Sequence, residues 1–413
     1  MQPPPPYEGV LVRVSAAFRH RDFRVIWWGA LASTIGTWMQ KYAQSWLVLS
    51  LTGSAFYLGL DDLLNQLPII LFTLLAGVIA DRYDRRLLLV GSQIVQAASA
   101  FALGALVWTG RIEIWHVLAL SFISGCGQAF GGPAYQSLIP SLVPRKDLPN
   151  AIALNSIQFN LSRVLGPMLG TPVLLLAGAA GCFFLNGVSF FIVIGALISL
   201  RVVHTPRAKP SHLMEDLKGG LRYMRDEPAL RMLTFLVFLS TFLAMPLVTF
   251  LPIFAKDVLT GTSAPETRLS GLMAAQGLGA IGGALIVAGL GRFAHMGRAL
   301  LSVQVGFGVF IALFAMTRSL PVSYLLLFIC GGAFMMVFSL SSSLVQLVVP
   351  DHLRGRVMSI YMLALRGGGP IGAFASGIAA TYLSPTSVLV VNGVLLSAVA
   401  GYFLIRSHGI REL

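Results

Sequence analysis

Long apolar stretches recur along the whole chain, and short polar segments separate them. Most of the stretches are long enough to cross a bilayer as a helix, which takes about 20 residues. They are continuously apolar and lack the alternation of a barrel strand, so we expect helices. The pattern predicts an all-α membrane protein with twelve spans, at residues 25–51, 55–80, 87–109, 115–139, 151–176, 180–201, 231–255, 268–290, 299–317, 321–346, 357–382 and 386–406.

One polar stretch is much longer than the others and divides the predicted spans into two sets of six. It covers residues 202–230, where leucines and Met224 recur at helical spacing among basic residues. That pattern suits a helix lying on an anionic membrane surface, although a flexible linker fits equally well. We expect an N-terminal segment at 1–24, six-helix halves at 25–201 and 231–406, the linker between them, and a tail at 407–413.

A short motif, Arg-x-x-Gly-Pro, occurs once in each predicted half, at residues 163–167 and 366–370. Each copy has a serine seven residues before the arginine and follows a Val-Pro loop. The chain therefore contains an internal duplication, and the two halves are predicted to be pseudo-symmetric.

Charge sets the predicted orientation. Only 11% of the 413 residues are charged and 56% are hydrophobic, whereas a soluble domain carries roughly 25% charge. Of the 29 lysines and arginines, 22 fall on the side of both termini, four on the opposite side and three within spans. The positive-inside rule then places both termini in the cytoplasm. Because these basic residues are scattered over many loops, we do not expect nucleic-acid binding.

Several kinds of chemistry find no support in the sequence. The N-terminus does not resemble a signal peptide. The three cysteines lie within apolar spans, and the histidines lie at span ends or in loops. Residues 277–282 spell a dinucleotide-binding motif but lie within a predicted membrane helix, where Gly279 and Gly283 would instead permit close packing. We expect no enzyme activity, no cofactor and no metal site.

Five ionisable residues remain inside the predicted spans. They are Lys41, Asp61, Asp62, Arg163 and Arg366. A charged side chain at the bilayer centre is costly and normally faces a cavity or a partner. A purely structural interpretation stays open, in which the lysine neutralises an aspartate and the arginines bind carbonyls freed by the prolines.

Lys41 and the two aspartates are predicted to form a proton-coupling site. Each lies about ten residues from the turn near Gly53, so an antiparallel hairpin would bring them to a similar depth, roughly 15 Å. Two carboxylates beside an ammonium group can share a proton and release it as their surroundings change.

The two arginines are predicted to bind substrate. An arginine stays charged, so it would serve as a fixed charge for an anionic substrate or a partner carboxylate. We expect Arg163 and Arg366 to face one another from equivalent helices. Further polar lining of the cavity is predicted at Gln44, Gln66, Asn160 and Gln276.

The predicted loop after the second span carries the motif by which the chain resembles the major facilitator superfamily. In that family the residues of this loop latch the two halves together on the cytoplasmic side. The motif appears here as Gly77, Asp81, Arg82, Asp84, Arg85 and Arg86, with a weaker echo at Arg292 and Arg298. Position 84 is aspartate where the family usually has glycine.

Within the superfamily, Trp38-Met-Gln, Leu51-Thr-Gly-Ser and the segment 352–359 resemble the enterobactin-exporter-like branch. The resemblance also implies an antiporter motif on the fifth span. Residues predicted to bend helices are Gly166, Pro167 and Gly170, with Gly369 and Pro370 in the second half. Thr171 departs from that motif, and the fourth span lacks the arginine of many proton-coupled exporters.

The resemblance implies a secondary transporter that works by alternating access in a bacterial inner membrane. We expect a proton-coupled exporter of small amphipathic compounds such as drugs or siderophore-like molecules, acting as a monomer within the lipid bilayer. A lysophospholipid flippase or a facilitative transporter of the same fold is the alternative, and a nontransporting receptor is a more distant one.

Overall fold

The structure, a computed structural model, describes residues 16–82, 84–200, 213–259, 261–291, 293–350 and 353–407; for 73–82, 213–218 and 220 it describes the backbone alone. Nearly all of these residues are helical. In chain order the elements are η1 (Ala16–Arg19), α2 (Arg21–Thr52), α3 (Ala55–Arg82), α4 (Arg85–Trp108), α5 (Ile114–Leu142), α6 (Leu148–Ile198), α7 (Leu213–Asp226), α8 (Pro228–Thr249), α9 (Leu251–Ile253), η2 (Phe254–Val258), α10 (Pro265–Leu290), α11 (Met296–Met316), α12 (Leu320–Val348), α13 (Arg354–Tyr382) and α14 (Pro385–Arg406).

The helices match the predicted spans closely. Each predicted span coincides with helical residues, and α6 covers two of them because it turns at Gly178, whose φ of 66° suits glycine. Within the described part of the chain, nine helices are long and apolar enough to cross a membrane. α2 and α13 fall outside that set and carry Lys41 and Arg366. The count of twelve spans and the side of the termini stay predictions.

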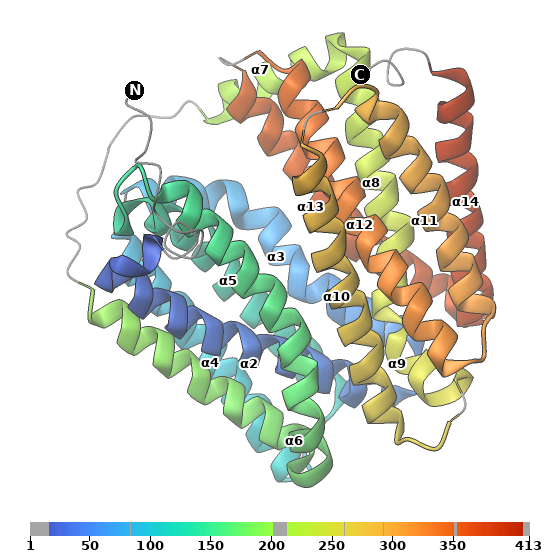
Figure 1. The fold of residues 1–413 in the computed structure, drawn as a ribbon. Coiled ribbons are helices and arrows are strands. Elements are labelled where there is room, and N and C mark those ends of the chain that lie inside the picture. The colour runs from blue at the N-terminus through green and yellow to red at the C-terminus, as the bar shows by residue number, and fades with distance from the viewer. Residues whose placement is uncertain are drawn as a thin grey trace.

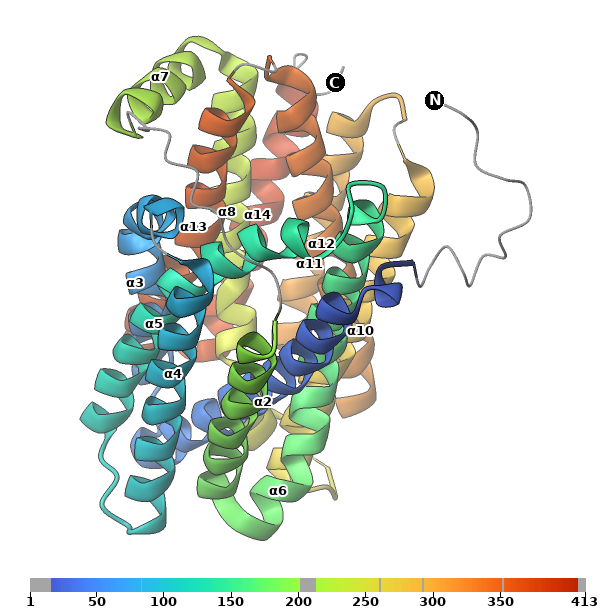
Figure 2. The same cartoon turned by 90° about the vertical axis from the view of Figure 1, so that its left-hand side faces the viewer.

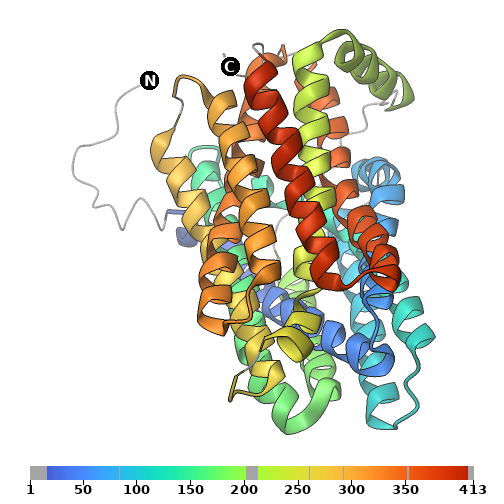
Figure 3. The ribbon, with the colours of Figure 1, turned by 90° about the vertical axis from the view of Figure 1, so that its right-hand side faces the viewer.

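The long helices form two groups with the same packing pattern, α2–α6 and α8–α14 (Figure 1). In the first group, α2 packs on α6, α3 on α5 and α4 on α6. In the second group the corresponding pairs are α8 with α13, α10 with α12 and α11 with α14. Figures 2 and 3 show the two groups from opposite sides. This repeated packing is what the duplicated sequence motif predicts.

Glycines let helices approach closely inside each group. A Cβ at Gly279 would overlap the carbonyl of Phe328, and one at Gly283 would overlap Gly332, so α10 and α12 touch through their backbones. The predicted packing role of these two glycines is therefore confirmed. Gly372 of α13 meets the carbonyl of Phe242 on α8 in the same way.

Two helix pairs make most of the contact between the groups. α3 packs on α13 and α6 packs on α10. At the first contact Gly59 lies against the carbonyl of Ala373, and the rings of Phe56 and Phe374 are 5.7 Å apart. We call the end of the molecule at which α2 turns into α3 the Gly53 end, and the opposite end, which carries α7, the α7 end. The Gly59–Ala373 contact lies close to the Gly53 end.

The linker contains a helix, α7, and its place on a membrane surface stays a prediction. α7 lies across the α7 end of the second group and contacts α13 and α8 (Figures 1 and 2). Met224 is buried there among apolar side chains of the second group, whereas Leu221, Arg222 and Arg225 are exposed. Residues 202–212 of the predicted linker lie outside the described residues.

Candidate functional site

The predicted lysine and one aspartate meet between the first two long helices. Lys41 Nζ of α2 lies 3.3 Å from Asp62 Oδ1 of α3, and the two side chains are 39% and 13% exposed. The antiparallel hairpin through Gly53 brings them to the same depth, as the spacing predicts. This pair is an ion pair in an apolar setting, where each charge offsets the desolvation cost of the other.

The second aspartate has different partners, although it is the next residue in the chain. Asp61 Oδ1 accepts a hydrogen bond from Ser121 Oγ at 2.5 Å, and Gln44 Nε2 donates to the two carboxylate oxygens at 3.0 and 2.9 Å. A step of one residue along a helix turns the side chain by about 100°, so Asp61 points to α5 while Asp62 points to Lys41. The cluster therefore holds one carboxylate paired with a cation and one bound by neutral groups.

Ser121 is a functional candidate that sequence reasoning missed. It lies on α5, its hydroxyl reaches Asp61, and its carbonyl accepts from Asn65 Nδ2 at 3.4 Å. One turn further along, Gly125 lies against the backbone of α3 at Asn65. Small residues four positions apart mark a face on which another helix can pack closely, and that spacing was the available signal. The same bonds place Gln44, predicted as cavity lining, within the shell around Asp61, where it is 8% exposed.

Trp38 lies between two of the predicted charges. Its ring centroid is 5.7 Å from Lys41 Nζ and 5.5 Å from Arg163 Cζ. Both distances are within the range of a cation–π interaction. The Phe159 ring contacts the same indole edge to face, at 6.0 Å. The predicted proton-coupling cluster and the first arginine are thus linked through one aromatic side chain.

Arg163 connects the two groups of helices. Its Nη2 donates to Gln276 Oε1 at 2.5 Å, which joins α6 to α10. Next to this bond, Val164 packs against Gly277. Two residues predicted to bind substrate are therefore bonded to each other, and Gln276 is 5% exposed.

Arg366 has no such partner. It lies on α13, is exposed, and makes no hydrogen bond or ion pair with any residue that the structure describes. Gln66 of α3 is half-buried and likewise has no hydrogen bond within the described ranges. The two arginines therefore lie on equivalent helices but at separate interfaces. Asn160 is half-buried and donates to the Ser156 carbonyl of its own helix.

The described part of the predicted latch binds within the first group. Asp84 caps α4 by accepting from the Arg86 backbone at 2.8 Å. The Arg85 guanidinium donates to the Ser137 carbonyl of α5 at 3.1 Å, and that of Arg86 donates to the Ile198 carbonyl of α6. These bonds tie the loop after α3 to the ends of its neighbouring helices.

The other latch residues are less fully described. Gly77, Asp81 and Arg82 belong to the last turns of α3, whose side chains are not described, and Arg292 lies outside the described residues. Arg298 is exposed in the first turn of α11. The contact of the loop with the second half stays a prediction.

The predicted helix-bend residues lie at sites of close packing. α6 and α13 stay helical through Pro167 and Pro370. A Cβ at Gly166 would overlap Trp38 of α2, and one at Gly170 would press on Met39. Their small size therefore lets α6 lie against α2. In the second group, a Cβ at Gly369 would lie 3.1 Å from the Met245 side chain of α8.

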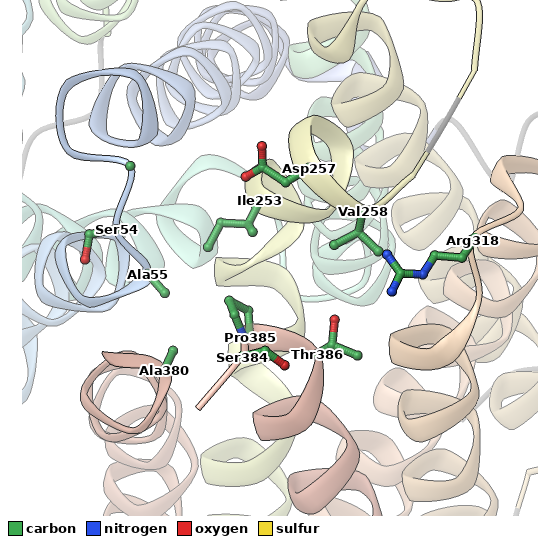
Figure 4. Close-up of a pocket in the computed structure, with 11 residues that line it drawn as sticks. Ser54, Ala55, Ile253, Asp257, Val258, Arg318, Ala380, Ser384, Pro385 and Thr386 are labelled. Atoms are coloured by element: carbon green, nitrogen blue, oxygen red, sulfur yellow. The ribbon is translucent and has the colours of Figure 1, made fainter. Parts of the chain in front are cut away.

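A cavity of about 540 Å³ opens at the Gly53 end between the two groups (Figure 4). The α2–α3 turn lines one side and helices of the second group line the other. Asp257 and Arg318 are its charged residues, and the rest of the lining is Gly53, Ser54, Ala55, Ile253, Val258, Ala380, Ser384, Pro385 and Thr386. It lies outside the Phe56–Phe374 contact, toward the surface.

Comparison with known proteins gives consistent matches over the whole chain. The profile of the transmembrane secretion effector family matches residues 13–409. The multidrug efflux pump Tap of Mycolicibacterium fortuitum is 27% identical over 387 residues, covering 90% of this chain and 94% of that protein. Macrolide efflux protein A of Streptococcus pyogenes is 25% identical over 394 residues, covering 92% and 94%.

Solved structures share the fold at low sequence identity. A POT family transporter in complex with 5-aminolevulinic acid superimposes with a TM-score of 0.77 at 11% identity, covering 95% of this chain and 97% of that one. A bacterial homologue of the human lysosomal transporter Spinster, inward-facing and unoccupied, gives 0.70 at 14% identity and covers 98% of each chain.

Proposed function

Because the chain belongs to the transmembrane secretion effector family of the major facilitator superfamily, we propose that it exports small amphipathic compounds from the cytoplasm in exchange for protons. The observation that carries the proposal is the charged cluster inside the helical bundle. Lys41, Asp62 and Asp61 lie at the same depth, and together they provide both an ion pair and a carboxylate without a cation. The efflux pumps among the relatives support the direction of transport.

The contacts between the groups support alternating access. They lie between mid-depth and the Gly53 end, where Tyr42 Oη donates to the Glu266 carbonyl at 2.9 Å and Gly59 meets Ala373. With the α7 end in the cytoplasm, this arrangement is the state that receives substrate from inside. Rocking of the two halves then breaks the contacts at the Gly53 end and opens the bundle toward the cavity of Figure 4.

Proton exchange uses the cluster in the same cycle. In the outward-facing state a proton binds a carboxylate oxygen of the cluster, and in the inward-facing state it leaves to the cytoplasm before substrate binds. Protonation of Asp62 would release Lys41 from its ion pair, and deprotonation would restore the pair. The charge of the cluster therefore changes by one between the two halves of the cycle.

The test is transport by the purified full chain in proteoliposomes under an imposed pH gradient, with radiolabelled erythromycin and the neutral dye phenylnaphthylamine as probes. We expect gradient-driven accumulation by the double variant Asp61→Asn, Asp62→Asn to fall by at least about tenfold, because a carboxamide neither binds nor releases a proton during the cycle. Asp226→Asn, an exposed position on α7, is the matched control and should transport like the wild type.

Two outcomes would change the proposal. Full gradient-driven transport by the double variant removes the cluster from proton coupling. Equal downhill flux with and without the gradient in the wild type identifies a facilitative transporter instead.

A further inference from the structure

Each interface between the two groups contains one arginine and one glutamine at corresponding positions. Arg163 and Arg366 occupy the same place in the repeated Arg-x-x-Gly-Pro motif. Gln66 and Gln276 each lie eleven residues after the first residue of α3 and of α10, Ala55 and Pro265. α6 packs on α10 and α13 packs on α3. The duplication therefore provides two Arg–Gln pairs.

Only one of the two pairs is formed. Arg163 donates to Gln276 at 2.5 Å. Arg366 and Gln66 have no hydrogen bond or ion pair with the residues that the structure describes, and Arg366 is exposed. Because the two pairs arose by duplication, the difference between them indicates that the polar atoms of Arg366 and Gln66 are available to bind a ligand.

The helix register places Arg366 and Gln66 across from each other. Gly59 of α3 touches Ala373 of α13, and the two helices run in opposite directions. Gln66 lies seven residues after Gly59, and Arg366 lies seven residues before Ala373. Seven residues are almost two turns, so each side chain returns to the contact face within about 20° and lies roughly 10 Å from the contact. Gln66 and Arg366 both lie on the α7 side of the contact, on α3 and α13, which run side by side (Figure 2).

Among the side chains that the structure describes, no carboxylate pairs with Arg366. Asp62, one turn from Gln66 on the same face of α3, is paired with Lys41. Asp61 is bound by Ser121 and Gln44. A guanidinium within a membrane protein normally has a partner, because an isolated charge there is costly. The missing partner is therefore an anion that comes and goes.

We propose that Arg366 and Gln66 form a subsite for an acidic group of the transported compound, and that the substrates include amphipathic acids carrying a sulfonate, carboxylate or phosphate. This inference rests on the proposed function and specifies its substrate class. The guanidinium presents a planar fork that matches two oxygens of such a group. The Gln66 amide adds a neutral donor on the facing helix, while Arg163 and Gln276 hold the other interface together.

The test is a comparison of two dyes that differ by one acidic group, anilinonaphthalene sulfonate and phenylnaphthylamine. Binding is measured by fluorescence with the full chain in phosphatidylcholine nanodiscs, with empty nanodiscs as the blank. We expect Arg366→Gln to weaken sulfonate binding by about tenfold, since it removes a hydrogen bond to a charged group, and to leave phenylnaphthylamine binding within about twofold. Gln66→Leu should weaken sulfonate binding alone, by a smaller factor.

Two further variants separate a local effect from misfolding. Arg366→Lys keeps the charge but loses the planar fork, so it should weaken sulfonate binding less than Arg366→Gln does and leave phenylnaphthylamine binding unchanged. Arg145→Gln makes the same substitution in the exposed loop between α5 and α6 and should leave the binding of both dyes unchanged.

The inference is overturned if the wild type does not bind the sulfonate, or if Arg366→Gln weakens both dyes equally. Export in proteoliposomes gives an independent reading of the proposed function. Binding of the sulfonate through Arg366 without any export would support the subsite and contradict the proposed export function. Export of phenylnaphthylamine without sulfonate binding would support the export function and contradict the subsite.

Discussion

Two adjacent aspartates in α3 have different surroundings, and this difference is the most informative feature at the scale of the residue. Asp62 has a cation 3.3 Å away, whereas Asp61 has Ser121 and Gln44 as its hydrogen-bond partners among the described residues. A substitution at either aspartate therefore removes a different interaction. The surroundings of Asp61 can be tested without touching either carboxylate.

We expect Ser121→Ala to lower the free energy of unfolding by about 1–3 kcal/mol, because it removes a hydrogen bond to a carboxylate in an apolar setting. Ser137→Ala is the matched control on the same helix, since its hydroxyl bonds only the Ala134 carbonyl of α5 itself. The measurement is denaturation of the purified protein in nanodiscs. A double-mutant cycle with Asp61→Asn should show coupling between residues 61 and 121, and strict additivity would contradict the hydrogen bond.

At the scale of the element, the positions of glycines decide which helices touch. Gly279 and Gly283 join α10 to α12, Gly59 joins α3 to α13, and Gly166 joins α6 to α2. Each allows a close approach of backbones that a Cβ would prevent, and in a membrane such packing replaces the hydrophobic effect between helices. Not every glycine in these helices has that role.

Gly279→Ala should destabilise the protein by about 1–3 kcal/mol, because its Cβ would overlap the Phe328 carbonyl and force α10 away from α12. Gly282→Ala, three residues away on the same helix, should have little effect, since its Cβ would lie 3.7 Å from the Phe328 ring. Thermal unfolding of the two purified variants checks this. Equal losses of stability would mean that the substitutions act through something other than packing.

At the scale of the whole molecule, the two groups of helices meet mainly where α3 packs on α13 and α6 packs on α10, and they carry the polar site between them. The contact of Phe56 with Phe374 lies on the proposed path between that site and the cavity at the Gly53 end. Alternating access requires this contact to open in every cycle. A covalent bridge across it should therefore stop transport.

We expect Phe56→Cys with Phe374→Cys, in a background with Cys126, Cys182 and Cys330 replaced by serine, to lose transport when a short bifunctional maleimide bridges the new thiols. The matched control is Phe101→Cys with Phe184→Cys, whose rings are 6.1 Å apart within the first group. Bridging that pair should leave most transport intact, because α4 and α6 move together. Undiminished flux through the bridged first pair would contradict the rocking cycle.

The positions of the helices and most of the candidate site residues follow from the amino-acid sequence alone. Apolar length places a helix such as α3 at Ala55–Arg82 where 55–80 is predicted, because a span must satisfy its own backbone hydrogen bonds. Buried charges such as Lys41 and Asp62 stand out because they are costly in lipid. The repeated arginine motif indicates two equivalent halves.

Only the tertiary structure decided which of these residues touch. Arg163 and Gln276 are 113 positions apart, and Ser121 is 60 positions from Asp61. Spacing along one helix gives the face of a side chain but not the helix that packs against it. That choice depends on shape, through glycines such as Gly59 and Gly125, and on the order in which the helices assemble. For the same reason the sequence shows two equal arginines, while the structure shows Arg163 bonded to Gln276 and Arg366 without a hydrogen bond to any residue that it describes.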